Sequence, residues 1–136
     1  MGQTKTSLEQ ETPSKKLILV VEGDPSLRIP LGYLLQENGY EVVFAGTGAS
    51  ALQKVKDHPP HLILLETILP DRSGFEICRT LRSKREYRET KIVFLSVNDG
   101  KEEFEKGTFV GADACIVKPF AMTHLIDTIQ NLLAIK

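Results

Sequence analysis

The sequence has little that would place it in a membrane, on nucleic acid or in an oxidising compartment. It has no apolar run near the ~20 residues that a membrane span requires, and its polar start has no hydrophobic signal core. Its formal net charge is -1, so bulk charge does not build a nucleic-acid-binding face. Cys78 and Cys115 lack the close spacing of a zinc or redox motif, and we expect both to be reduced residues packed in the core. These absences favour a cytoplasmic protein that contacts neither membrane nor nucleic acid directly.

The size and composition indicate one compact domain. The chain has 136 residues, of which 41% are hydrophobic and 26% charged, which is typical of a globular domain with a single core. Residues 1–15 are polar and have no apolar periodicity, so we expect a flexible N-terminal arm followed by a folded domain over residues 16–136.

From Leu17 onward, short apolar runs alternate with helical patterns, which predicts a parallel sheet covered by helices on both faces. The predicted strands are residues 17–21, 41–45, 61–65, 91–95 and 114–117. The predicted helices are residues 25–38, 48–57, about 75–81, 100–111 and 122–134, with a charged loop over 84–90. We expect Asp24 to cap the first helix and Pro30 to kink it. Right-handed crossovers then predict an α/β fold, a doubly wound (βα)5 sandwich with a five-stranded parallel sheet.

Four polar side chains stand at the predicted carboxyl ends of strands: Glu22, Glu66, Ser96 and Lys118. In doubly wound sheets, ligands bind beyond these ends, near the point where the strand order reverses. We therefore expect the four side chains to share one pocket. His58, His61 and His124 have no mutual metal spacing, and the Gly46-Thr47-Gly48 turn lacks the lysine and glycine pattern of a phosphate-binding loop.

Three segments, residues 17–25, 61–74 and 117–120, carry a resemblance to a known family. Their most specific parts are the Leu-Pro-x-x-x-Gly turn after Glu66 and the Lys-Pro-Phe triplet that begins at Lys118. Together they resemble the receiver domain of two-component response regulators, over about residues 16–133. The resemblance implies a flavodoxin-like topology, a cis peptide bond before Pro119, and an acceptor aspartate that takes a phosphoryl group from a histidine kinase.

The resemblance also implies a role for each matching position of this sequence. The phosphoacceptor position holds Glu66, the two acidic positions after the first strand hold Glu22 and Gly23, the hydroxyl position holds Ser96, the lysine position holds Lys118, and the aromatic switch position holds Cys115.

Two of these residues depart from the family pattern in ways that bear on chemistry. Mg²⁺ takes oxygen ligands in near-octahedral geometry, and Gly23 offers no side-chain oxygen. Asp24 is adjacent, but it is also the expected helix cap. Glu66 is longer than aspartate by one methylene, which moves its carboxylate about 1.5 Å outward, and misplacement on that scale costs roughly a hundredfold in a positioned reaction. The sequence therefore predicts a degenerate phosphoacceptor pocket.

These departures predict an atypical receiver, or pseudo-receiver, that is not an enzyme, needs no cofactor and signals through protein–protein contacts without phosphorylation. Glu66 has two open interpretations: it pairs with Lys118 and Ser96 and fixes one signalling state, or it is a solvated carboxylate in an inert site. The alternative function is a Mg²⁺-dependent phosphoacceptor, with Glu22, Asp24 and Glu66 as metal ligands. A flavodoxin-like cofactor binder is a further alternative, which the missing phosphate-binding loop disfavours.

The resemblance implies a signalling partner, either a histidine kinase or an output protein, and a monomer or weak dimer. The expected contact surface comprises the fourth helix, the fifth strand and the fifth helix. Its exposed residues would be Phe104, Phe109, Thr123, His124, Asp127 and Gln130.

Overall fold

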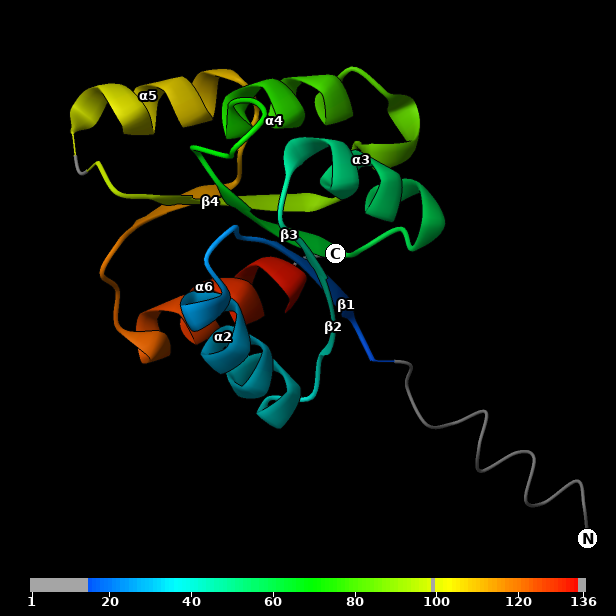
Figure 1. The fold of residues 1–136 in the computed structure, drawn as a ribbon, viewed down its shortest axis with the longest axis vertical. Helices are drawn as coiled ribbons and strands as arrows, with labels where there is room; N and C mark the ends of the chain where they lie inside the picture. Colours follow the sequence, from blue (N-terminus) through cyan, green and yellow to red (C-terminus); the bar gives the residue numbers. More distant parts are fainter. Residues whose placement is uncertain (1–14, 99, 135–136) are drawn as a thin grey trace, which may run out of the picture.

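The structure, a computed structural model, describes residues 15–98 and 100–134 (Figure 1). The predicted N-terminal arm, residues 1–15, lies outside the described residues except for Lys15. The described residues form five parallel strands in one sheet, with the order β2-β1-β3-β4-β5. This confirms the predicted doubly wound α/β fold. None of the described helices is long and apolar enough to cross a bilayer.

The strands alternate with helices along the chain, and the element labels are those of Figure 1. The strands are β1 (Leu17–Val21), β2 (Glu41–Ala45), β3 (Leu62–Glu66), β4 (Lys91–Ser96) and β5 (Ala114–Val117). The helices are α2 (Pro25–Glu37), α3 (Gly48–Asp57), α4 (Gly74–Arg82), the 3-10 helix η1 (Arg85–Tyr87), α5 (Lys101–Phe109) and α6 (Met122–Ala134).

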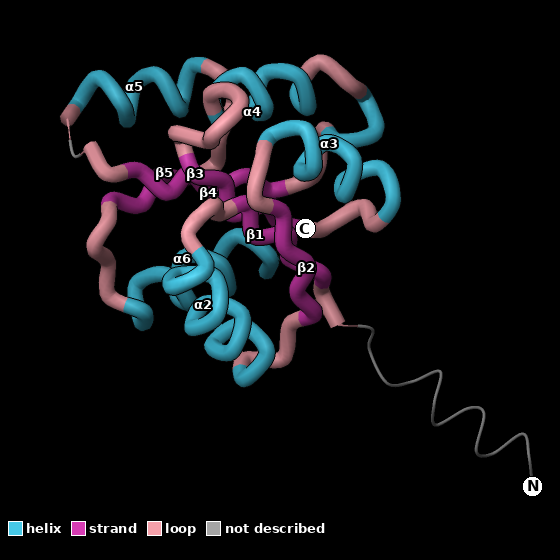
Figure 2. Tube along the Cα trace, viewed as in Figure 1, coloured by secondary structure: helices cyan, strands magenta, loops and turns pink. Residues whose placement is uncertain are grey.

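The sheet lies between two helical layers. Helices α3, α4 and α5 cover one face, and α2 and α6 cover the other (Figures 1 and 2). Because successive residues of a strand point to opposite faces, each strand contributes to two hydrophobic clusters. Leu19 and Ile63 belong to the cluster under α3 and α4, while Ile18 and Leu62 belong to the cluster that includes residues of α2 and α6. The central strands are thus buried on both sides, as their continuous apolar runs predict.

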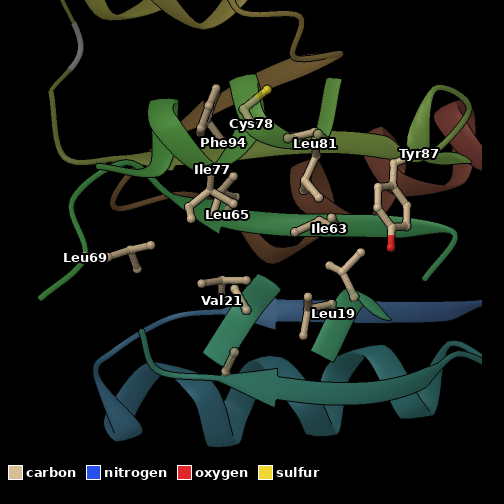
Figure 3. Close-up of a cluster of buried hydrophobic side chains, with 14 of the residues drawn as sticks. Leu19, Val21, Ile63, Leu65, Leu69, Ile77, Cys78, Leu81, Tyr87 and Phe94 are labelled. Atoms are coloured by element: carbon tan, nitrogen blue, oxygen red, sulfur yellow. The ribbon is translucent and has the colours of Figure 1, made fainter. Parts of the chain in front are cut away.

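The structure corrects several local predictions. Strand β3 is shifted by one residue and includes Glu66, which pairs in register with Leu95 of β4. The charged loop predicted over 84–90 contains η1, whose Tyr87 is buried in the cluster shown in Figure 3. Helix α5 is shorter than predicted. Pro30 lies inside α2, and the kink expected there stays a prediction.

The turn between β3 and α4 is held by close backbone packing. The Gly74 N–H donates to the carbonyl of Thr67 at 2.8 Å, and a side chain at Gly74 would overlap the carbonyl oxygen of Glu66. Asp71 in the same turn accepts hydrogen bonds from the N–H groups of Gly48 (2.7 Å) and Ala49 (2.9 Å), at the start of α3. The turn therefore fixes the backbone from which Glu66 projects.

Candidate functional site

The candidate site lies at the carboxyl ends of the strands, where the strand order reverses around β1. Glu22 follows β1, Glu66 ends β3, and Lys118 follows β5. A cavity of about 650 Å³ lies at this edge. Its wall is mixed, with polar residues Glu22, Asp24, Ser26, Glu66 and Lys118 and apolar residues Leu27, Val97, Pro119, Phe120 and Met122. The parallel sheet thus brings together side chains from distant parts of the sequence.

Lys118 joins the two carboxylates of the pocket. Its ammonium Nζ donates to Glu22 Oε1 at 2.7 Å and to Glu66 Oε2 at 2.9 Å. The Glu22 side chain is 1% exposed, and those of Lys118 and Glu66 are 16% and 18% exposed. The peptide bond between Lys118 and Pro119 is cis, as the resemblance implies. The pocket therefore contains a mostly buried group of two carboxylates and one ammonium.

The protonation of this group follows from its burial and its neighbours. Burial raises the pKa of Glu22; the hydrogen bond from Lys118 lowers it, and the charge of Glu66 raises it further. Burial disfavours the charge on Lys118, but the hydrogen bonds to Glu22 and Glu66 outweigh this and raise the pKa of Lys118. Lys118 is therefore a cation at neutral pH that donates hydrogen bonds to both carboxylates.

The two residues after Glu22 do not complete a ligand set. Gly23 contributes only its N–H, which donates to Glu66 Oε1 at 3.4 Å. Asp24 is the N-cap of α2, as predicted, and accepts hydrogen bonds from the N–H (3.0 Å) and the hydroxyl (2.8 Å) of Ser26. These two bonds, the hydroxyl first, hold the pKa of Asp24 below its usual value. Asp24 lines the cavity, but its carboxylate caps the N-terminus of α2.

Ser96 is buried and turns toward α5. Its single hydroxyl proton has two acceptors within reach, the carbonyl of Asn98 at 3.1 Å and Glu103 Oε2 at 3.3 Å. Its oxygen accepts a hydrogen bond from the Asn98 N–H at 3.1 Å. Glu66 therefore pairs with Lys118, as one of the two interpretations predicts. The Ser96 hydroxyl, which that interpretation also pairs with Glu66, contacts Asn98 and Glu103 instead. Glu103 was missed by the sequence analysis, because its helix has no clear apolar stripe that would show how it faces the sheet.

The remaining candidate residues lie outside the carboxylate pocket. Cys78 is fully buried, and burial raises the pKa of its thiol to about 11. Cys115, at the switch position on β5, is half-buried. His61 is exposed, but its Nδ1 accepts a hydrogen bond from the N–H of Leu17 at 2.9 Å, a structural role that the spacing did not predict.

The donor set does not fit the magnesium ion that the resemblance implies. Glu22 and Glu66 each bond an oxygen to Lys118, and Gly23 has no side-chain oxygen. Over residues 15–98 and 100–134, no three His, Cys, Asp or Glu side chains are grouped as metal ligands. The lysine ammonium thus lies between the carboxylates that a cation would need.

Comparison with known proteins identifies the class. The model of the family described as the response regulator receiver domain matches residues 18–130. The match covers most of the chain and all five strands, and the chain belongs to this family. It is a receiver domain of two-component signalling.

Particular relatives extend the similarity. The chain is 28% identical to protein PilG of Pseudomonas aeruginosa over 123 residues, which cover 90% of each. It is 39% identical to the alkaline phosphatase synthesis transcriptional regulatory protein PhoP of Bacillus subtilis, over 87% of this chain and 48% of that protein. The chain therefore spans about half the length of such transcriptional regulators. The solved structure of the chemotaxis protein CheY4 of Vibrio cholerae is similar, with a TM-score of 0.82 and 31% identity over 88% of this chain and 99% of that chain.

Proposed function

We propose that this receiver domain signals without being phosphorylated and acts through contacts with other proteins. The observation that carries the proposal is the Lys118 ammonium, which bonds to both Glu22 and Glu66 at 2.7 and 2.9 Å. In this arrangement the pocket supplies its own cation. This cation offsets one of the two negative charges of Glu22 and Glu66 without a metal.

Phosphoryl transfer to a carboxylate requires a free nucleophilic oxygen, a divalent cation and fixed donors for the transferred charge. Glu66 Oε2 already accepts from Lys118, and Glu66 Oε1 faces the N–H of Gly23. Gly23 supplies no ligand, and Asp24 is used as a helix cap. The first two requirements, the free oxygen and the divalent cation, are each weakened by a named residue, which supports loss of the transfer reaction.

The state of the pocket also follows from these contacts. Glu66 reaches Lys118, while the hydroxyl of Ser96 is turned toward Glu103. We infer that Glu66 fixes the pocket in one arrangement through the lysine alone, with the hydroxyl outside that arrangement. The domain would then present one surface permanently, and its signal would depend on which partner is present.

The partner surface proposed for this function is formed by α5, β5 and α6. Phe104 and Phe109 on α5 are 60% and 87% exposed, and Val117 of β5 is 37% exposed. The outer face of α6 carries the exposed residues Thr123, His124, Asp127 and Gln130. Exposed aromatic side chains beside polar ones are typical anchors of protein interfaces. Receiver domains interact with histidine kinases and output proteins, and a protein of one of these kinds is the proposed partner.

The proposal is tested by exposing the protein to acetyl phosphate, and separately to beryllofluoride, each with Mg²⁺. Intact mass reports a phosphoryl group, and amide chemical shifts report binding at the pocket. We expect neither to change for the natural chain. The matched control is Gly23→Asp combined with Glu66→Asp, which fits sterically because the nearest atom to a Cβ at Gly23 is Gly46 O at 3.6 Å. This control should gain one phosphoryl group.

If the natural chain itself gains the phosphoryl mass, Glu66 is an acceptor and the alternative function, with Glu22 and Asp24 holding Mg²⁺, is correct.

A further inference from the structure

Glu103 links the buried hydroxyl of Ser96 to the first turn of α5. Its carboxylate Oε2 lies 3.3 Å from Ser96 Oγ, and the two residues come from different elements, β4 and α5. Ser96 is fully buried, and Glu103 is partly buried. A hydrogen bond that involves a charged group and is shielded from water is stronger than an exposed neutral one.

The same carboxylate lies close to two other parts of the site. Burial raises the pKa of Cys115 on β5, and the negative charge of Glu103 raises it further. Glu103 also lines a groove of about 330 Å³ together with Thr67 and Leu69, in the turn that follows Glu66. One side chain of α5 therefore borders the end of β4, the strand β5 and the turn after β3.

Helix α5 has few local features that fix its first turn. Its N-cap, Gly100, makes no side-chain capping bond, and Gly107 lies within the helix, where glycine is unfavourable. The C-terminal half packs closely on the core: Gly107 is buried, a Cβ added there would lie 3.1 Å from the Phe94 ring, and the Lys106 ammonium lies 4.8 Å from the centre of the Phe75 ring. In the N-terminal half, Glu103 contacts the buried hydroxyl of Ser96.

We propose that Glu103 is a positioning residue that fixes the first turn of α5 by holding the Ser96 hydroxyl. The position of this turn, which carries exposed Phe104, then depends on the hydroxyl at the edge of the pocket. Glu103 would thus hold in place the surface that the proposed function assigns to a partner. The inference rests on the proposed function only because it treats α5 as part of that surface. The coupling itself requires no phosphoryl group.

Amide hydrogen exchange, followed by NMR in the full chain, tests this coupling. The reporter is the N–H of Phe104, which bonds to the carbonyl of Gly100, and the reference is the N–H of Val110, which bonds to the carbonyl of Lys106. In Glu103→Ala, we expect exchange at Phe104 to rise roughly tenfold, the effect of losing one such hydrogen bond. In Ser96→Ala the rise should be at least as large, because that variant also loses the contacts to Asn98. Exchange at Val110 should change little.

Three further variants separate the coupling from a general loss of structure. The double variant Ser96→Ala with Glu103→Ala should exchange at Phe104 no faster than Ser96→Ala alone, because Ser96→Ala already removes the bond to Glu103 together with the contacts to Asn98. Glu103→Gln keeps an oxygen acceptor and should restore protection close to that of the natural chain. Glu105→Ala, at an exposed position of the same helix, should leave exchange at Phe104 unchanged.

Two results would overturn the coupling: unchanged exchange at Phe104 in Glu103→Ala, or single-variant effects that add in the double variant. Failure of the proposed function is a separate result, since it appears as phosphorylation of the natural chain whatever the exchange rates are. Each idea can therefore fail while the other stands.

Discussion

Two glycines flank Glu66, and the fold constrains them very differently. Gly23 faces the Glu66 side chain, and a Cβ built there would have its nearest neighbour, Gly46 O, at 3.6 Å, an ordinary contact. Gly74 packs against the Glu66 main chain, and a Cβ there would overlap the carbonyl oxygen of Glu66. One glycine leaves space in the pocket, and the other is required by the turn that supports it.

This difference shows that the frame of the pocket and its chemistry are separable. The turn over residues 69–74 sets where Glu66 leaves the sheet, through backbone contacts that do not involve the carboxylates. Position 23 determines whether the pocket has a second acidic ligand, and the backbone there does not require glycine. The frame of this receiver fold therefore does not depend on a second acidic ligand at position 23.

The largest expected effect comes from Gly74→Ala. The added methyl group must displace the backbone of β3 or α4, and such overpacking should lower the free energy of unfolding by about 3 kcal/mol. Gly23→Ala is the matched control and should change it by less than about 1 kcal/mol. Urea denaturation measures both. Equal losses in the two variants would contradict the separation of frame and chemistry.

A smaller effect is expected from Lys118→Met, which removes the cation but keeps an unbranched side chain. Glu22 is 1% exposed, and an unpaired buried carboxylate is costly. Because Lys118 and Glu66 retain some exposure, we expect a loss of about 2 kcal/mol at neutral pH, below the full range for a buried pair. Adding Glu22→Gln should recover part of this loss in urea denaturation.

The pH dependence of the free energy of unfolding tests the same contact between Lys118 and the two carboxylates. The pKa of Lys118 is raised above 10.5, so the stability that its charge contributes is present at neutral pH and lost as the pH rises through the raised value. The difference between the natural chain and Lys118→Met should therefore narrow at high pH. A difference that stays constant would mean that the methionine variant fails by packing and not by loss of charge.

Much of the fold could be predicted because its signals are local. Apolar runs such as Leu17–Val21 and the spacing along α6 identify elements without knowledge of their neighbours. The alternation of these elements then leaves few topologies. Tyr87 shows the limit of such local signals. A single buried aromatic residue within a charged stretch has no periodicity, so the segment was predicted to be a loop.

The site was predictable where it depends on strand ends. Glu22, Glu66 and Lys118 follow or end parallel strands, whose carboxyl ends share one edge, so their meeting follows from the fold. The contacts of Glu103 and Asp71 were not predictable in this way. Each depends on how a helix or turn is oriented against another element, 7 residues away for Glu103 and Ser96 and 23 for Asp71 and Gly48.

The smallest expected effect comes from Asp71→Asn, which tests whether the frame also depends on a polar contact at its surface. The hydrogen bonds from Gly48 and Ala49 at the start of α3 hold the pKa of Asp71 below its usual 3.8. A carboxyl with a lowered pKa contributes stability above its unfolded value, and this is lost as the pH falls through the lower, folded value.

The natural chain should therefore be slightly more stable than Asp71→Asn at pH 7, and the difference should shrink below about pH 3.8. Urea midpoints at the two ends of this range measure the change. Asp127→Asn, at an exposed position of α6, is the control and should show no such dependence. If Asp71→Asn has no effect at pH 7, the turn is fixed by its backbone contacts around Gly74 alone, and the hydrogen bonds of Asp71 to the start of α3 add nothing to its stability.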